Sequence, residues 1–422
     1  MSILPFLKMN KEILLLILTG IFICIDLLTI RGITFLTEGL KRNTQIIIYS
    51  VFWTATSFVL IFLIYSFANP MPVRSVQQVS RQYFLTGCIA LFYIPKLFFI
   101  AFSLVDEIIW LLASLLRKFK KFSMLAKERL LLFHHLGWTA AAIVLLTLLH
   151  GIVWGRFQYT VEHKSLEFQD LPESFEGFKI VHLSDIHASA FYEHTEKLSE
   201  IIAAVNKEKP DLIVITGDFV NYFAEELDGL ENIFYRLQAP YGVYAVTGNH
   251  DYGDYHLWNT IEEKKSNYLL LMKKLRYLGI RVLHNESVLI YRNNECFALA
   301  GVDSWGLPPL ASYGDPKEAL KNIGRDTFTI LLSHHPQLWE KKIAGQLPVQ
   351  LTLSGHTHGM QLGINTGNRC WSPAALIYRH WAGLYEQNQQ FLYVNRGLGY
   401  IGLPMRINMP AEITVLTLYR KR

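Results

Sequence analysis

The sequence predicts two parts, a region of four membrane-spanning helices followed by an α/β domain. The 422 residues are 51% hydrophobic and only 18% charged, and long apolar runs are confined to the first 156 residues. After that point the apolar runs shorten to strand length and alternate with helix-like segments, which is typical of an α/β sheet. We therefore place a transmembrane region at 1–156 and an α/β domain at 157–422.

Four apolar runs have the length that a membrane span requires. They cover residues 13–30, 46–68, 83–105 and 133–153. A helix needs about 20 apolar residues to cross the hydrocarbon core of a bilayer. Buried helices of a large soluble core are the alternative, but such helices would carry a polar face, which these runs lack. The first run lacks a small-residue cleavage pattern at its end, so we expect it to be retained rather than removed as a signal peptide.

Two charged side chains lie inside the expected spans, and each requires a partner. Asp26 and Lys96 each lie 13 residues past the start of their runs. If both runs enter from the same side, a rise of about 1.5 Å per residue places both charges about 20 Å deep. An unpaired charge costs at least about 2.5 kcal/mol there, so we predict an ion pair between these two side chains. The alternative is that Lys96 snorkels to an interface while Asp26 lies near one.

The positive charge of the chain belongs to its membrane half. Residues 1–156 hold 15 basic and 6 acidic side chains, whereas the rest of the chain holds 25 basic and 29 acidic ones. A slightly acidic α/β domain disfavours the basic surface on which duplex binding depends. We therefore expect no nucleic acid as a specific partner.

The distribution of basic residues also predicts an orientation in the membrane. With four spans, the amino terminus, the second loop and the α/β domain share one side, which carries six basic residues near the spans against nine on the other. Six of those nine lie in the third loop, at 117–129. The positive-inside rule places that loop in the cytoplasm and the α/β domain outside it. The same segment is compatible with a basic amphipathic turn on anionic lipid or with a solvated loop.

Polar motifs stand where five of the expected strands end. These strands are expected at 178–183, 212–216, 243–247, 328–332 and 349–353. The motifs are Ser-Asp-Ile-His at 184–187, Thr-Gly-Asp at 216–218, Thr-Gly-Asn-His-Asp at 247–251, Ser-His-His-Pro at 333–336 and Ser-Gly-His-Thr-His-Gly at 354–359. Further strands are expected at 158–168, 297–302, 391–395 and 413–419, and helices at 195–207 and 266–277. Open α/β sheets bind ligands at the carboxyl ends of their strands, so one site is predicted there.

The residue types in these motifs suit a pair of metal ions. Carboxylate and imidazole together suit Mn²⁺, Fe or Zn²⁺, and only four isolated cysteines occur in the chain, which disfavours a structural zinc site. Asp185 and His187 are two residues apart, a spacing that puts both side chains on one face of an extended segment. Glycines precede three of the candidate ligands and permit an unusual backbone there. Two metals about 3.5 to 4 Å apart would clamp a phosphoryl group.

The five motifs, in this order, resemble those of the calcineurin-like metallophosphoesterase superfamily over residues 178–418, most closely its bacterial membrane-anchored branch. The resemblance implies a metallophosphoesterase-type α/β sandwich. It implies one metal held by Asp185, His187, Asp218 and His358 and a second held by Asp218, Asn249, His334 and His356. His250, oriented by Asp251, would protonate the leaving oxygen or stabilise the transition state. Met360 departs from the branch, which usually has a second glycine at that point.

These features predict a membrane-anchored dinuclear phosphoesterase that hydrolyses a phosphate ester or phosphoanhydride by metal-bound hydroxide. Its cofactors would be two divalent ions (Mn, Fe or Zn), and its substrate a phosphorylated small molecule or lipid. A phospholipid or nucleotide-lipid pyrophosphatase is the nearest alternative. A transporter or assembly factor with a phosphate-binding domain is another, but it predicts loss of a ligand or of the catalytic histidine, and all are present. We expect His335 to be a neighbour of the site, His182 a core residue, and Arg396 and Arg406 structural rather than phosphate-binding.

Overall fold

The computed structural model describes residues 11–68, 73, 75–117, 130–308, 311–366 and 370–421. The chain divides into a membrane unit, Met1–Pro72 with Leu85–His150, and an α/β unit, Val73–Phe84 with Gly151–Arg422. The segment Val73–Phe84, which the sequence placed with the membrane region, thus groups with the α/β unit. Most of the basic segment at 117–129 lies outside the described residues.

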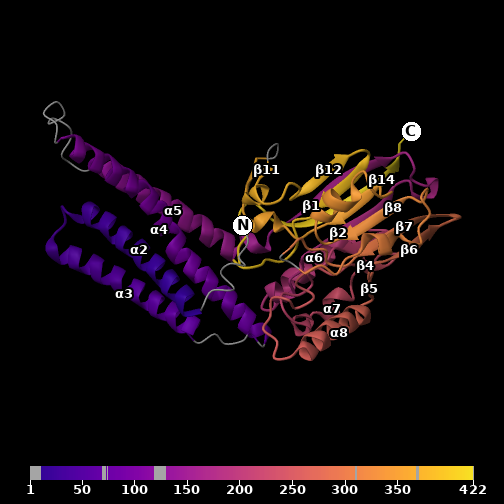
Figure 1. The fold of residues 1–422 in the computed structure, drawn as a ribbon, viewed down its shortest axis with the longest axis horizontal. Coiled ribbons are helices and arrows are strands. Elements are labelled where there is room, and N and C mark those ends of the chain that lie inside the picture. The colour runs from indigo at the N-terminus through magenta and orange to yellow at the C-terminus, as the bar shows by residue number, and fades with distance from the viewer. Residues whose placement is uncertain are drawn as a thin grey trace. The chain divides into compact units, whose positions relative to one another are not determined.

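The four expected spans are present as long apolar helices (Figure 1). They are α2 (Lys11–Thr37), α3 (Arg42–Ala68), α4 (Val76–Leu116) and α5 (Leu131–Val153). Large apolar side chains on these helices are widely exposed; Leu16 and Phe58, for example, are more than 70% exposed. Such a surface suits contact with lipid, where a helix is stable because its backbone hydrogen bonds are satisfied internally.

Helix α4 is longer than the predicted run at 83–105 because its polar residues find partners on other helices. The carboxylate of Asp106 is buried 3.2 Å from Nε2 of His134 on α5. The carboxylate of Glu107 accepts hydrogen bonds from Arg31 on α2 at 2.8 and 2.9 Å. A polar pair that is satisfied between helices does not end a span. The helix therefore continues through both acidic residues.

Glycines let these helices approach closely. A Cβ atom added at Gly32 of α2 would lie 2.6 Å from the ring of Phe99 on α4, and one added at Gly137 of α5 would lie 2.9 Å from the backbone oxygen of the same residue. Small residues at such crossings are the usual means of packing helices in a membrane. Phe99 thus fills the space between α2 and α5.

The predicted ion pair between Asp26 and Lys96 is confirmed. Nζ of Lys96 lies 2.6 Å from Oδ1 of Asp26, which is fully buried. The hydroxyl groups of Thr56 and Tyr93 donate to the same carboxylate at 3.4 and 3.3 Å. The pair therefore joins α2 to α4 within a buried polar cluster, and α3 contributes the threonine.

The α/β unit is built on two six-stranded sheets. The first runs in the order β1 (Tyr159–Phe168), β14 (Ala411–Arg420), β2 (Phe178–Leu183), β3 (Leu212–Ile215), β4 (Val243–Ala245) and β5 (Ile280–Val282). The second runs in the order β12 (Gly383–Gln387), β13 (Gln390–Val394), β9 (Leu351–Ser354), β8 (Thr329–Ser333), β7 (Glu295–Val302) and β6 (Glu286–Arg292). A small two-stranded sheet pairs β10 (Ile364–Asn365) with β11 (Cys370–Trp371). Strands β2 to β5 are mutually parallel, as are β7, β8, β9 and β13, so the carboxyl ends within each set share one edge.

Apolar side chains from both sheets form a shared core, and helices cover the outer faces. Ile180 and Val214 of the first sheet belong to the same buried cluster as Leu299 and Leu332 of the second. The helices are α6 (Thr195–Lys207), α7 (Glu231–Phe234), α8 (Ile261–Tyr277) and α9 (Pro316–Leu320). Shorter helical turns are η2 (Gly155–Phe157), η3 (Glu173–Phe175), η4 (Ala188–Phe191), η5 (Ala224–Leu227), η6 (Trp339–Ile343), η7 (His358–Gln361) and η8 (Pro373–Leu376). The predicted α/β sandwich is therefore confirmed.

Among the described elements, the sequence missed five strands, the short helices α7 and α9, and the start of α8. Strands β6 and β12 lie at the sheet edges, β5 has three residues, and β10 and β11 have two each, so none gives a long buried apolar run. Helix α8 begins at Ile261 rather than at residue 266. The Thr260 hydroxyl accepts a hydrogen bond from the backbone N–H of Glu263 at 3.1 Å, which caps this polar first turn.

The first turns of α4 are part of the α/β core. Val79 is 1% exposed and Tyr83 is 6% exposed, and both belong to the buried cluster that contains Leu398 and Tyr400. Burying such side chains contributes about 1.5 to 3 kcal/mol each. The α/β unit is therefore completed by a segment that precedes it in the chain by some 70 residues.

We predict that Asp26→Asn and Lys96→Met are strongly coupled. Each single change leaves the other group buried without its partner, so each should lower the free energy of unfolding by about 3 kcal/mol. The double variant should lose much less than the sum. Unfolding of the full chain in detergent measures all three, and additive losses would contradict the pairing. The pair Arg31 and Glu107, whose arginine side chain is 55% exposed, is the control and should show weak coupling.

Candidate metal centre

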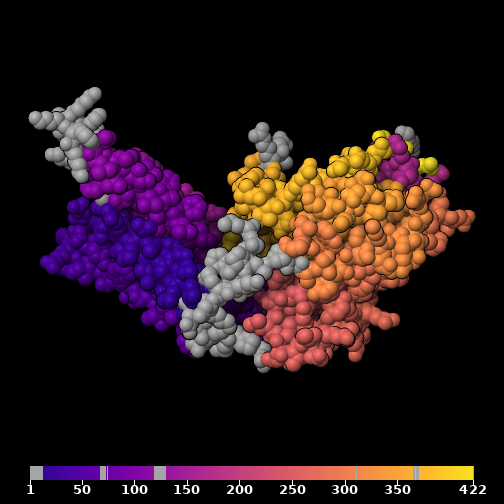
Figure 2. Space-filling view, viewed as in Figure 1, coloured from indigo at the N-terminus to yellow at the C-terminus, as the bar shows by residue number. Residues whose placement is uncertain are grey.

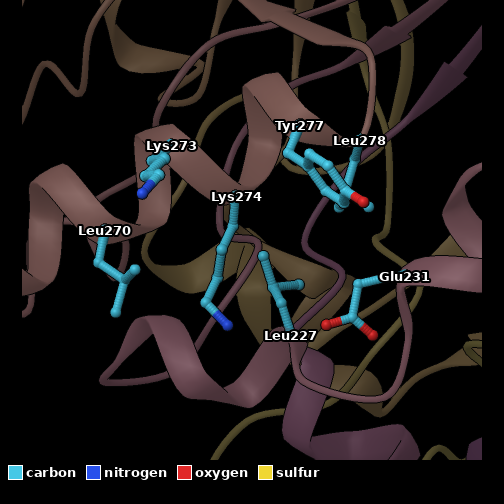
Figure 3. Close-up of a pocket in the computed structure, with 7 residues that line it drawn as sticks. All are labelled: Leu227, Glu231, Leu270, Lys273, Lys274, Tyr277 and Leu278. Carbon is cyan, nitrogen blue, oxygen red and sulfur yellow. The ribbon is translucent and has the colours of Figure 1, made fainter.

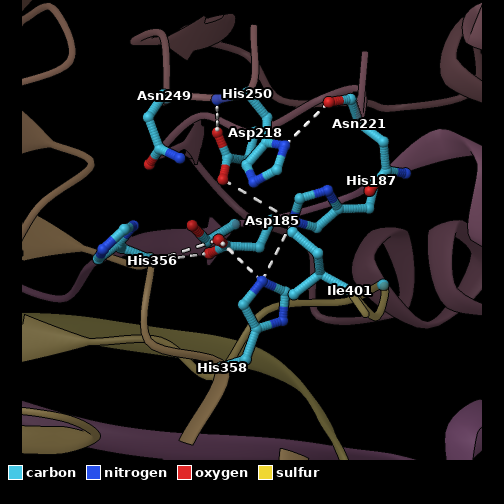
Figure 4. Close-up of polar contacts among 12 residues, drawn as sticks. Asp185, His187, Asp218, Asn221, Asn249, His250, His356, His358 and Ile401 are labelled. Carbon is cyan, nitrogen blue, oxygen red and sulfur yellow. Dashed lines mark hydrogen bonds and ion pairs between the residues drawn. The ribbon is translucent and has the colours of Figure 1, made fainter. Parts of the chain in front are cut away.

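The candidate ligands gather at the strand ends that the sequence predicted (Figure 4). Asp185 and His187 follow β2, Asp218 follows β3, Asn249 and His250 follow β4, and His356 and His358 follow β9. His334 follows β8. The side chains of Asp185, His187 and His334 are fully buried, and those of Asp218, Asn249 and His358 nearly so. One compact polar centre thus draws on both sheets.

The backbone is unusual at five of these residues. They have positive φ angles, which side chains other than glycine rarely adopt: Asp185 (50°), His187 (45°), Asp218 (55°), His356 (73°) and His358 (52°). Such a conformation costs of the order of 1 to 3 kcal/mol per residue and persists only where the surroundings enforce it. Strain concentrated on polar residues at one edge indicates a functional site.

The glycines in these motifs provide space as well as backbone freedom. Gly217 has a φ of +88°, as the sequence led us to expect. Gly248 and Gly355 do not have a positive φ, but a Cβ atom at Gly248 would lie 2.1 Å from Oδ1 of Asp218, and one at Gly355 would lie 1.9 Å from Oγ of Ser184. Any larger residue at these two positions would displace the loops that carry the candidate ligands.

Asp185, His187 and His358 form a first group that fits a cation. Nε2 of His187 lies 3.1 Å from Nε2 of His358, which lies 3.2 Å from Oδ1 of Asp185. The ring Nδ1 atoms of both histidines are buried and have no partner among the described residues. Two imidazole nitrogens and a carboxylate oxygen that converge in this way present three lone pairs to one point, which is the donor set of a transition-metal site.

A second group adjoins the first through Asp218. Nε2 of His334 lies 3.1 Å from Oδ2 of Asp218 and 3.2 Å from Nδ1 of His356. The same oxygen of Asp218 lies 3.7 Å from Nε2 of His187 in the first group. Oδ1 of Asn249 is buried without a partner among the described residues, so it is free to serve as a further ligand. Asp218 therefore stands between two groups that can each hold a metal.

His335 is closer to this centre than the sequence suggested. One ring nitrogen of His335 lies within 4.8 Å of a ring nitrogen of His334 and of one of His356, close enough for the three to bind one ion. Its ring centroid is 4.2 Å from that of His356. Both ring nitrogens are buried and have no partner among the described residues. His335 is therefore an additional candidate ligand, signalled in the sequence only by the adjacent pair of histidines.

The electrostatics favour the metal-binding forms of Asp218 and His356 but the protonated form of His334. Burial opposes a charge on His334, but Asp218 and Asp185 outweigh it and raise the pKa of His334 to about 9. Burial, with repulsion from His334, lowers the pKa of His356 to about 3. Burial alone would raise the pKa of Asp218, but the neighbouring histidines hold it well below its usual range. Ionised carboxylates and a neutral imidazole are ready to bind a cation, which would displace the proton of His334.

His250 is held so that one ring nitrogen faces the centre. Nδ1 donates to the backbone oxygen of Asn221 at 2.8 Å, because a carbonyl can only accept (Figure 4). The ring stacks on Tyr255 with centroids 4.4 Å apart. The backbone N–H of His250 donates to Oδ1 of Asp218 at 2.9 Å. These contacts fix the tautomer and leave Nε2 available to hold a proton.

The prediction that Asp251 orients His250 needs correction. The carboxylate of Asp251 accepts hydrogen bonds from the backbone N–H groups of Asp218, Phe219 and Gly248 at 2.8 to 2.9 Å. It therefore fastens two loops together, while Asn221 orients the histidine ring. Burial, with the nearby charge of Asp218, raises the pKa of Asp251 to about 7.

The two arginines have structural roles, as expected. Arg396 forms ion pairs with Glu412 and Glu162. Arg406 is fully buried, and its guanidinium donates to backbone carbonyls of Arg396, Gly397, Gly399 and Met409. His182 is likewise a core residue, with Nε2 2.9 Å from the hydroxyl oxygen of Thr216. None of these three residues is positioned to bind a substrate phosphate.

Sequence reasoning missed two tyrosines beside the centre. Oη of Tyr255 accepts a hydrogen bond from Nδ2 of Asn249 at 3.0 Å, and Oη of Tyr378 lies 3.3 Å from Nε2 of His356. No motif marks either residue, although Tyr255 follows the Gly-Asn-His-Asp motif closely. Met360, where a glycine was expected, has a φ of 48°, the conformation that glycine adopts most readily, and is 43% exposed.

A separate apolar hollow lies between α8 and η5 (Figure 3). Its walls include Leu227, Leu270 and Tyr277, and Lys274 at its edge pairs with Asp228. These elements belong to the coral segment at one end of the α/β unit in the space-filling view (Figure 2). The hollow contains none of the candidate ligands, so we assign it no role in the chemistry.

Comparisons with known proteins agree with this geometry. The model of the calcineurin-like phosphoesterase family matches residues 178–360, and that of the transmembrane domain of probable calcineurin-like phosphoesterases matches residues 10–156. The uncharacterized metallophosphoesterase YkuE of Bacillus subtilis is 33% identical over 61% of this chain and 85% of its own.

Two further relatives extend the similarity. Phosphodiesterase YaeI of Escherichia coli is 30% identical over 61% of this chain and 87% of its own. The uncharacterized metallophosphoesterase Cj0846 of Campylobacter jejuni is 26% identical over 90% of this chain and 93% of its own, so it matches much of the membrane region as well. The chain therefore belongs to the calcineurin-like metallophosphoesterase family, in a form with four transmembrane helices.

Proposed function

We propose that this protein is a membrane-anchored, dinuclear metal-dependent phosphoesterase that hydrolyses a phosphate ester or phosphoanhydride. The observation that carries the proposal is the position of Asp218, whose Oδ2 lies 3.1 Å from Nε2 of His334 and 3.7 Å from Nε2 of His187. A single carboxylate between two histidine groups is suited to bridging two cations. Its family membership supports the same chemistry.

The two metals would have different ligands apart from Asp218, which both would share. Asp185, His187, Asp218 and His358 would hold one ion, and Asp218, Asn249, His334 and His356 the other. Bound there, two divalent ions (Mn, Fe or Zn) would polarise the phosphoryl group and lower the pKa of water. The protein supplies the spacing, because buried hydrogen bonds to Asp251 and Asp185 hold the loops in which five of these positions have a strained backbone.

The remaining step is the transfer of a proton to the leaving oxygen. His250 would donate this proton. With Nδ1–H donating to Asn221, a second proton can reside on Nε2 and pass to the leaving group. Tyr255 restricts the ring to one plane by stacking on it. A pre-oriented acid of this kind contributes a factor of about 10² to 10⁴ to the rate.

The candidate substrates are phosphate esters and pyrophosphates that are accessible to a membrane protein. The name of the E. coli relative favours a phosphodiester as the substrate. The presence of a membrane unit favours a phospholipid or a nucleotide-lipid pyrophosphate as the substrate. Assaying the full chain in detergent against phosphate monoesters, diesters and pyrophosphates, with added Mn²⁺, Fe²⁺ or Zn²⁺, distinguishes these classes. If the protein hydrolyses none of these esters, the result would contradict the proposal.

We predict that two substitutions in the centre differ in their effect on metal binding. Asp218→Asn should nearly abolish activity and lower the metal content, because this one carboxylate would help to hold both ions. His250→Ala should keep both ions and lower turnover by about 10² to 10⁴, the usual contribution of a general acid. Metal analysis and rates on the same preparations measure both effects. Loss of both metals in His250→Ala, with full activity in Asp218→Asn, would reverse these roles.

We also propose that the α/β unit faces away from the cytoplasm. A fifth span within the third apolar run would reverse this orientation, but the described part of that run is one helix, Val76–Leu116. An even number of spans puts the amino terminus and the α/β unit on one side. The larger number of basic residues near the spans on the other side favours a cytoplasmic location for that side.

Protease added to intact cells or spheroplasts tests this orientation. We expect digestion of the α/β unit without lysis, while a cytoplasmic marker protein in the same sample stays intact. Digestion that occurs only after lysis would place the unit in the cytoplasm.

A further inference from the structure

We infer that Tyr83, at the start of the third span, positions the catalytic histidine His250 through Asn221. The inference rests on the proposed function, because it concerns the proton donor of that reaction. It is carried by two hydrogen bonds in series: Tyr83 donates to the side chain of Asn221, and His250 donates to the backbone oxygen of the same residue. Tyr83 is therefore a positioning residue that does not touch the reacting groups.

The hydroxyl of Tyr83 is placed deep in the α/β unit. It donates to Oδ1 of Asn221 at 2.8 Å, and the tyrosine is 6% exposed. Its ring meets that of Tyr400 edge to face, with centroids 5.1 Å apart. The residue belongs to the α/β unit although it lies on the same continuous helix, α4, as Lys96 of the membrane unit.

Every polar group of Asn221 takes part in a hydrogen bond. Its Nδ2 donates to Oγ of Ser189 and to Oε2 of Glu226, and its backbone N–H donates to the same glutamate oxygen at 2.8 Å. The side-chain oxygen accepts from Tyr83 and the backbone oxygen from His250. Since Asn221 is 1% exposed, water cannot replace a partner that is lost.

Removing the tyrosine hydroxyl would therefore disturb the histidine. A buried acceptor without a donor is costly, so the side chain of Asn221 would turn to seek another partner. Its backbone oxygen, which sets the direction of the His250 ring, would move with it. A small misplacement of a catalytic group lowers the rate even when the group itself is intact.

Packing alone would give a different result, and Tyr400 provides the comparison. Its ring lies against that of Tyr83, but its hydroxyl bonds to the backbone oxygen of Ala190 at 3.4 Å and accepts from Arg156 at 3.3 Å. Tyr400→Phe therefore removes a hydroxyl from the same aromatic cluster without changing the partners of Asn221. It is the matched control for Tyr83→Phe.

The first test compares two esters with different leaving groups on the full chain in detergent. With an alkyl phosphate ester, whose leaving oxygen needs a proton, Tyr83→Phe should lower kcat by about tenfold, a part of the contribution of a general acid. With the 4-nitrophenyl ester, whose leaving group departs without a proton, the change should be less than about twofold. KM and metal content should stay the same, and Tyr400→Phe should resemble the wild type with both esters.

The second test repeats Tyr83→Phe in the His250→Ala background. If the tyrosine acts through the histidine, the second substitution should cause no further loss. A further tenfold loss, an equal loss with both esters, or loss of metal would overturn the inference. Should Tyr83→Phe fail to accumulate, Asn221→Leu removes the same hydrogen bond and should show the same preference for the 4-nitrophenyl ester.

The outcomes separate this inference from the proposed function. A wild-type chain that is active with added metal, together with a Tyr83→Phe variant of equal activity toward the alkyl ester, would overturn the inference alone. A wild-type chain that hydrolyses no ester would overturn the proposed function and the inference with it.

Discussion

The carboxylate of Asp218 is the point on which the centre depends. Its Oδ2 faces Nε2 of His334 at 3.1 Å, and its Oδ1 accepts from the backbone of His250 at 2.9 Å. Its own backbone oxygen accepts from the N–H of His187 at 3.0 Å. One residue therefore connects the loops after β2, β3, β4 and β8. A change at this position would alter both the charge and the backbone of the centre.

The strain at this edge is balanced by buried hydrogen bonds. Five polar residues there have a positive φ, at a cost of the order of 1 to 3 kcal/mol each. Against this, Asp251 accepts several backbone hydrogen bonds, and Asp185 accepts from the N–H of His356. Hydrogen bonds to charged groups stabilise by about 1.5 to 3 kcal/mol each. The loops therefore keep their form before a metal binds, which is the preorganisation that a catalytic site requires.

Sequence reasoning succeeded where a property is local and failed where it depends on approach in space. Span length and motifs at strand ends are written in consecutive residues, and equal depth was enough to pair Asp26 with Lys96. The partner of the His250 ring is a backbone oxygen, which every residue has, so no side chain identifies Asn221 in advance. Asp251 was adjacent and acidic, and was wrongly preferred for that reason. Val79 belongs to the α/β core, although it precedes a run of lipid-facing residues on the same helix.

Helix α4 contributes its first turns to the α/β unit, so residues before 157 take part in the hydrogen bonds around the candidate site. Lys96 holds it to α2 by an ion pair, and 13 residues earlier Tyr83 meets the loop that orients His250. A fragment that begins at residue 157 would lack Tyr83, leave its pocket in the core unfilled, and release Oδ1 of Asn221 from its donor. The hydrogen bonds of Asn221 therefore depend on a residue of α4, the helix that also forms the third span.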